Sequence, residues 1–144
     1  MPRLGTDMPE EKKDLFSPLS ESEARLKNPV VLAYIGDTIY DLYVRTKLVK
    51  ESDEHVNELN GRARQIVNAA AQAKAAERIA FTEEEEAVYK RARNAKVGTA
   101  AKNMSLGDYH KATGLEAVIG YLYLTGARER LDAIFERIFE DEQS

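Results

Sequence analysis

Two acidic residues occupy positions where the surrounding sequence predicts a largely apolar helix. Asp37 lies in the helical stretch 30–49, and Glu116 is the only acidic residue between positions 109 and 127. A buried carboxylate without a partner is costly, and it takes up a proton or a cation instead. Because Mg²⁺ prefers carboxylate oxygens, both residues are candidate metal ligands and candidate catalytic residues.

Small residues beside the two carboxylates leave room for a ligand. Gly36 precedes Asp37 in mid-helix, where glycine costs roughly 1 kcal/mol relative to alanine, so we expect another backbone or a ligand to approach closely. Three small residues lie one turn from Glu116: Ala112, Thr113 and Gly120. Another interpretation stays open at this point, because each carboxylate could contact a helix terminus or pair with a distant arginine.

The composition restricts the kind of metal and the class of protein. The 144 residues include no cysteine and two histidines, which excludes thiolate sites and disfavours zinc sites built from histidine. The length and the 43% hydrophobic content predict one domain with a modest core. The sequence contains neither a stretch long enough to span a membrane nor the apolar core of a signal peptide, so we expect a cytoplasmic protein.

The elements that must position these carboxylates are all predicted to be helical. Asn28 and Pro29 are typical of a helix start, and Thr82 with Glu85 forms a capping box. No convincing alternation of apolar and polar residues predicts a strand, so the fold class is all-α, a helical bundle. The predicted helices are 30–49, 53–79 with a possible break near Gly61, 83–94, 108–124 and 128–141, with a loop at 96–107. Residues 1–27 are expected to be a flexible leader ending in a short helical turn at 20–26, and 28–142 to be the catalytic domain.

The first long helix is apolar on two sides, which predicts a homodimer. One stripe is expected to pack against helices of the same chain: Val31, Leu32, Ile35, Ile39 and Leu42. The second face carries Ala33, Tyr40 and Val44 and is expected to meet a second copy, which would leave Asp37 partly buried. A two-fold axis would place identical sites on the two antiparallel strands of a nucleic-acid duplex.

Residues 90–111 form a basic strip in a chain that is acidic overall. The formal net charge is −4, which argues against a nucleic-acid partner, but residues 90–111 hold six basic residues and one acidic residue. Double-stranded RNA is recognised mainly through phosphates and 2′-hydroxyls, which such a strip suits. The alternative is a solvated helix end whose basic last turn complements the helix dipole. The candidate RNA-binding residues are Arg91, Arg93, Asn94, Lys96, Lys102 and Asn103.

Two sequence motifs carry a resemblance to a known family. The run LAYIGDTIY at residues 32–40 resembles the first catalytic motif of the ribonuclease III family, and TGLEAVIGYLY at residues 113–123 resembles the second. The acids that most members add to these motifs fall at Val30, Ala33 and Thr113. Their absence, and that of a following double-stranded RNA-binding domain, is similar to the short Mini-III branch. The run RARNAK at residues 91–96 also resembles that branch.

The resemblance implies a homodimeric ribonuclease III fold and a metal-dependent endoribonuclease that cuts double-stranded RNA. Asp37 and Glu116 would bind Mg²⁺, with Mn²⁺ as a possible substitute, and the products would carry 5′-phosphates. The implied substrate is the precursor of large-subunit (23S) ribosomal RNA. Two rival hypotheses remain. One is a catalytically silent RNA-binding or scaffold module on the same fold, and the other is an all-α nucleotide pyrophosphohydrolase that uses the acids at 83–86.

Overall fold

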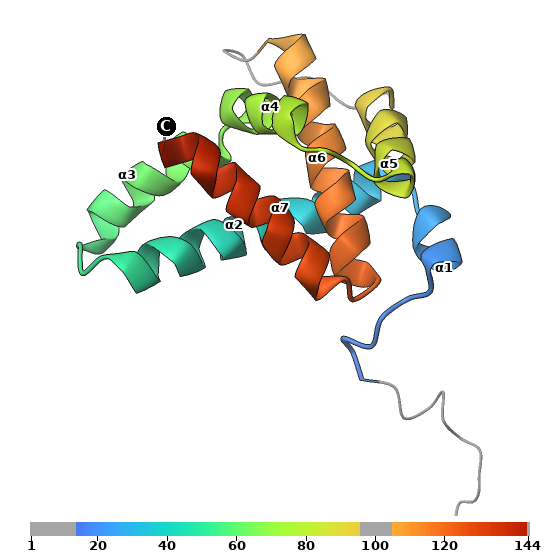
Figure 1. Cartoon of the computed structure of the whole chain (residues 1–144), viewed down its shortest axis with the longest axis horizontal. Coiled ribbons are helices and arrows are strands. Elements are labelled where there is room, and N and C mark those ends of the chain that lie inside the picture. The colour runs from blue at the N-terminus through green and yellow to red at the C-terminus, as the bar shows by residue number, and fades with distance from the viewer. Residues whose placement is uncertain (1–13, 96–104, 144) are drawn as a thin grey trace, which may run out of the picture.

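A computed structural model of the chain describes residues 14–95 and 105–143, with side chains described as far as residue 140. Within these ranges every regular element is a helix, which confirms the all-α prediction (Figure 1). The helices are α1 (Glu21–Arg25), α2 (Pro29–Glu51), α3 (Val56–Val67), α4 (Ala69–Arg78), α5 (Glu83–Arg93), α6 (Leu106–Leu124) and α7 (Arg128–Gln143).

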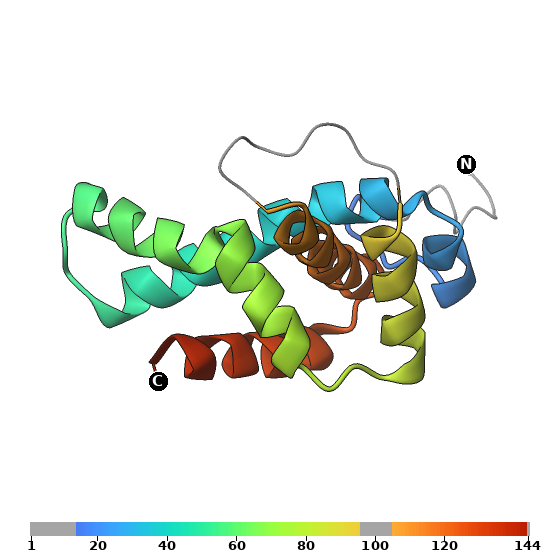
Figure 2. The same ribbon diagram turned by 90° about the horizontal axis from the view of Figure 1, so that it is seen from above.

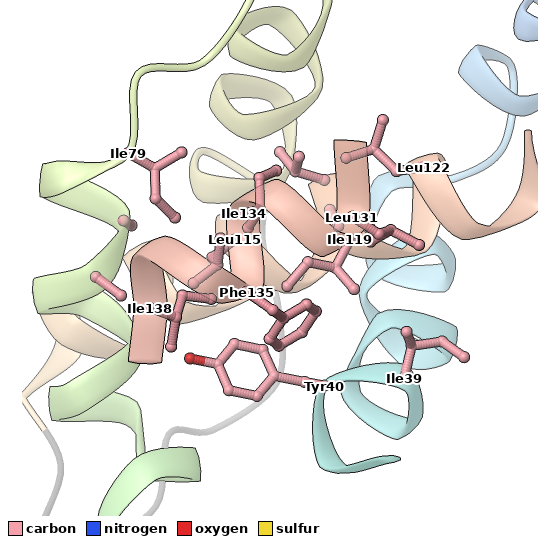
Figure 3. Packing of buried hydrophobic residues seen from close by; sticks show 14 of the residues in the cluster. Ile39, Tyr40, Ile79, Leu115, Ile119, Leu122, Leu131, Ile134, Phe135 and Ile138 are labelled. Carbon is pink, nitrogen blue, oxygen red and sulfur yellow. The ribbon is translucent and has the colours of Figure 1, made fainter. Parts of the chain in front are cut away.

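Helix α6 is the centre of the bundle. Its most extensive contact is with α2, and α4 and α5 also pack against it. Figure 2 shows α2 along one side of the molecule and α7 along the other, with α6 between them. The core fills this space, and its side chains come mainly from α2, α6 and α7 (Figure 3). Helix α7 contributes one apolar face to this core, because Leu131, Ile134, Phe135 and Ile138 are all buried.

Side-chain caps fix where several helices begin. The capping box predicted at Thr82 and Glu85 is present, and the Asn28 side chain accepts a hydrogen bond from the backbone of Val30. Gly126 follows the end of α6, with a φ of 75° that an L side chain rarely adopts. The short helical turn predicted at 20–26 is also present as α1, capped by Ser20.

The predicted helix 53–79 is divided, but at a different residue from the one expected. The break falls at Asn68, and Gly61 lies inside α3. The Asn68 side chain accepts a hydrogen bond from the backbone of Ala71 and donates to the carbonyls of Arg64 and Gln65. Asparagine therefore caps the end of α3 and the start of α4 together, which glycine cannot do.

The prediction of which face of α2 meets a second copy is wrong. Tyr40 and Val44 lie in the core of the same chain, at 1% and 0% exposure, and Ala33 is buried with them. From the stripe assigned to the core, Val31 is 51% exposed and Leu42 is 57% exposed. The face was misassigned because α2 carries apolar residues on both sides, so its spacing does not reveal which side its neighbours cover.

The segment before α2 contacts the bundle. The backbone N–H of Leu19 donates to the carbonyl of Leu124, and the Arg91 guanidinium donates to the carbonyls of Arg25 and Lys27. Ala24 of α1 is fully buried. The domain boundary between residues 27 and 28 stays a prediction. In the part of the chain that the structure describes, no helix is both long and apolar enough to cross a membrane.

Candidate active site at the crossing of α2 and α6

Two glycines allow the backbones of α2 and α6 to touch. A Cβ atom on Gly36 would lie 1.7 Å from the backbone oxygen of Glu116, and one on Gly120 would lie 2.0 Å from the backbone oxygen of Leu32. Both distances are far below van der Waals contact, so only glycine fits at either position. This confirms that Gly36 marks the close approach of another backbone, and it places Asp37 beside Glu116.

The carboxyl groups of Asp37 and Glu116 lie within hydrogen-bonding distance of each other. Glu116 is partly buried, and this burial, together with the charge of Asp37, raises the pKa of its carboxyl group to about 8. Asp37 is exposed rather than partly buried as expected, because the α2 face beside it has no covering element in this chain. One carboxylate of the pair is therefore open to solvent, and the other is anchored in the bundle.

Gln72 of α4 is a third polar residue of the site, and sequence reasoning missed it. The residue is 3% exposed, and its amide hydrogen-bonds to the Glu116 carboxylate, which opposes the rise in the pKa of Glu116. A signal was present in the sequence, because Gln72 shares one helical face with Ala69, Ala73 and Ala76. A large amide on the small-residue face of a helix indicates a buried polar partner.

The two carboxylates suit a hard divalent cation. Across residues 14–95 and 105–143, neither Asp37 nor Glu116 pairs with an arginine or a lysine. No group of three or more histidine, cysteine, aspartate or glutamate side chains gathers in these ranges either. Two adjacent carboxylates without a basic partner match the ligand set of Mg²⁺, which uses one or two carboxylates and completes its shell with waters and phosphate oxygens.

The predicted RNA-binding residues that the structure describes lie at the end of α5. Arg91 contacts two backbone carbonyls as described above. Arg93 lies 5.5 Å from the centre of the Tyr89 ring and donates from Nε to Oδ1 of Asn94 at 3.3 Å. Asn94 is the exposed C-cap of α5. The other predicted contacts, Lys96, Lys102 and Asn103, lie outside the described residues.

The acids at 83–86 have structural partners. Glu85 is buried, caps α5 and accepts two hydrogen bonds from Arg130, at 2.8 and 2.9 Å. Glu84 pairs with Arg25, and Glu86 pairs with Lys90. These partners account for the charges of three of the four acids, so the observation on which the pyrophosphohydrolase hypothesis depended has a different explanation.

Comparison with known proteins defines the class first. Residues 30–127 match the model of the ribonuclease III domain, a range that contains both Asp37 and Glu116. Among curated proteins, the Mini-ribonuclease 3 of Clostridium tetani is 44% identical over 122 residues, which cover 83% of this chain and 81% of that protein. The Mini-ribonuclease 3 of Staphylococcus aureus is 41% identical over 122 residues, or 82% of this chain and 91% of that protein.

A solved structure agrees with the sequence comparisons. A crystal structure of a protein from Fusobacterium nucleatum superposes with a TM-score of 0.76 and 30% identity, and covers 83% of this chain and 98% of that one. The chain therefore belongs to the ribonuclease III family and, within it, to the Mini-ribonuclease 3 group. It is an endoribonuclease specific for double-stranded RNA, from a family that uses a divalent metal ion.

Proposed function

We propose that Asp37 and Glu116 form the catalytic metal site of this endoribonuclease and hold Mg²⁺, with Mn²⁺ as a substitute. The observation that carries the proposal is the adjacency of the two carboxyl groups, one exposed and one anchored, without a basic partner among the described side chains. Metal binding requires both groups to be ionised, so a bound cation displaces the proton that the raised pKa of Glu116 favours.

The reaction is the hydrolysis of a phosphodiester that leaves a 5′-phosphate and a 3′-hydroxyl. The chemistry supplied by such a cation, when bound, is the activation of a water and the neutralisation of charge on the cleaved phosphate. Asp37 contributes an exposed carboxylate on the side of α2 that substrate can reach. Glu116 contributes the second carboxylate. Because the backbone of Glu116 lies against Gly36, the helix crossing fixes the position of this carboxylate relative to Asp37.

The substrate duplex is proposed to contact the end of α5 and the segment that follows it. Arg93 and Asn94 lie at this end, and Arg91 beside them joins α5 to the carbonyls of residues 25 and 27. Lys96, Lys102 and Asn103 would extend the surface. Contacts of this kind neutralise phosphates and do not read the base sequence.

The active form is proposed to be a homodimer that uses the exposed stripe of α2. Three large apolar residues of this stripe have no cover in the chain: Tyr34 is 79% exposed, Leu42 is 57% exposed and Val49 is 64% exposed. Large apolar side chains exposed along one side of a helix are typical of a protein interface. Asp37 lies at its edge, so a symmetric contact through this face would bring the two metal sites toward opposite strands of one duplex.

The biological substrate is proposed to be the precursor of 23S ribosomal RNA in the cytoplasm. The proposal comes from the resemblance to the Mini-III branch, and the Mini-ribonuclease 3 relatives place the chain in that group. The rival considered from the sequence was a catalytically silent RNA-binding module, for which the missing acids at Val30, Ala33 and Thr113 were the argument. The retained pair of carboxylates favours the enzyme.

One assay separates these functions. The purified chain is incubated with Mg²⁺ and a double-stranded precursor RNA, the same RNA as single strands, or nucleoside triphosphates. Of these three substrates, we expect only the duplex to be cleaved, and its products should carry 5′-phosphates. Adding a chelator should abolish this cleavage completely. Binding of the duplex without cleavage at any concentration of Mg²⁺ or Mn²⁺ would support the silent module, and release of pyrophosphate would support the pyrophosphohydrolase.

A further inference from the structure

Gln72 is the one buried side chain outside α2 and α6 that hydrogen-bonds to the carboxylate pair, among the residues that the structure describes. It stands in a helix otherwise rich in alanine, and the whole residue is 3% exposed. A buried amide needs hydrogen-bond partners, because leaving a donor unpaired costs about 1–3 kcal/mol. The partner here is the carboxyl group of Glu116.

Two polar contacts join α4 to α6 and hold this partner in place. The Gln72 amide contacts Glu116, and five residues further along α4 the Glu77 carboxylate pairs with Lys111. The alanine side chains between them allow the two helices to pack closely, since Ala73 and Ala76 are also buried. The amide is therefore carried by a fixed helix, which makes it suitable for orienting another side chain.

The Glu116 carboxyl group lies between two different neighbours. Asp37 stands on one side, and Gln72 stands on the other. The amide N–H donates to the carboxylate, so it can fix the orientation of that group relative to α4 and α6.

We propose that Gln72 is a positioning residue of the nuclease, which holds the Glu116 carboxylate by a hydrogen bond in the orientation that binds the divalent cation. The inference rests on the proposed metal site. Gln72 does not contact the cation or the RNA, and it acts through Glu116. Partners of this kind behind a metal ligand typically change metal affinity or activity by 10- to 100-fold when they are removed.

The test compares binding of Mn²⁺ alone, followed by electron paramagnetic resonance without RNA. Gln72→Met keeps the volume of the side chain and removes both the donor and the acceptor. We expect Mn²⁺ to bind this variant about 10-fold more weakly or worse. Duplex cleavage should need correspondingly more Mg²⁺ to reach half its maximal rate. Gln65→Met is the matched control, because Gln65 is exposed on α3 and has no contact with Glu116, and it should bind Mn²⁺ normally.

Two further variants, Glu116→Gln and Gln72→Asn, distinguish failure of the positioning role from failure of the metal site or of folding. Glu116→Gln tests the metal site itself. If it loses Mn²⁺ binding while Gln72→Met binds normally, the positioning role of Gln72 is wrong and the site stands. If Glu116→Gln also binds Mn²⁺ normally, the proposed site is wrong. Should Gln72→Met fail to fold, Gln72→Asn takes its place, because its shorter amide is withdrawn from Glu116, and normal binding of Mn²⁺ by that variant would equally overturn the inference.

Discussion

At the scale of single residues, the charge of Glu116 is the property that the site controls. Burial and the neighbouring Asp37 carboxylate raise its pKa to about 8, and Gln72 opposes them. Without a metal ion, the folded protein therefore keeps a proton here well above pH 4.5, the midpoint at which the unfolded chain releases it. The fold thus favours the protonated form of Glu116, whereas metal binding requires its ionised form.

This opposition predicts a pH dependence of stability in the metal-free protein. Between pH 5 and pH 8 the folded state holds more protons at Glu116 than the unfolded state does, so the free energy of unfolding should fall as the pH rises. The slope from one group is at most about 1.4 kcal/mol per pH unit. Urea unfolding with a chelator present measures it. Glu116→Gln should abolish this part of the slope, whereas Glu129→Gln, at an exposed position, should retain it.

At the scale of elements, the contact between α2 and α6 determines the geometry of the site. Sequence patterns could predict these helices and the close approach at Gly36, because caps and a mid-helix glycine are local signals. The buried face of α2 and the position of the helix break at Asn68 could not be predicted. Both depend on packing and on competing caps, which local spacing does not encode. Gln72 was missed because its role depends on α4 crossing α6.

Glycine-to-alanine substitutions test the helix contact. A Cβ atom at Gly120 would lie 2.0 Å from the backbone oxygen of Leu32, so Gly120→Ala must separate α2 from α6. We expect it to lower the free energy of unfolding by at least about 2 kcal/mol, the scale of overpacking in a core, and to impair cleavage. Gly107→Ala is the matched control, because nothing lies within 4 Å of a Cβ atom there. Equal stability of the two variants by urea unfolding would contradict a backbone contact at the site.

At the scale of the whole molecule, two surfaces are proposed to bind partners. They are the exposed apolar stripe of α2 and the end of α5. The first is proposed to bind a second copy and the second to bind RNA. The sequence predicted that α2 would supply a dimer interface but assigned it to the wrong face. The substitution that tests the interface must therefore be made on the exposed face instead. Val44→Glu, the natural choice from the sequence, would place a charge in the core, where Val44 is fully buried.

Leu42→Asp is the appropriate test of the interface. Leu42 is exposed in the isolated chain, so an aspartate there should leave the fold intact while it places a charge in the proposed contact. Light scattering should give a mass near 32 kDa, twice the 16.2 kDa of the chain, for the unsubstituted protein, and close to 16.2 kDa for the variant. Val56→Asp, at an exposed apolar position on α3, should remain dimeric. A dimer of undiminished stability in Leu42→Asp would exclude this face.

The RNA surface has a signature in the salt dependence of binding. Replacing Arg93, Lys96 and Lys102 by alanine removes up to three phosphate contacts. On the scale of B-DNA each contact contributes roughly 0.9 to the slope of log affinity against log salt concentration, so the slope should flatten by about two to three. Titrations of a non-cleaved duplex at several salt concentrations measure it. An unchanged slope would mean that RNA binds elsewhere on the molecule.

The central claim is that Asp37 and Glu116 together form the catalytic metal site. The most direct measurement is the rate of duplex-RNA cleavage at saturating Mg²⁺ by Asp37→Asn and Glu116→Gln, with thermal unfolding of the same samples. Each substitution keeps the shape of the side chain and removes the charge. We predict a loss of at least about 100-fold in rate for each variant, with thermal stability retained or increased. A folded variant of either kind that cleaves duplex RNA at a near-normal rate would contradict the account.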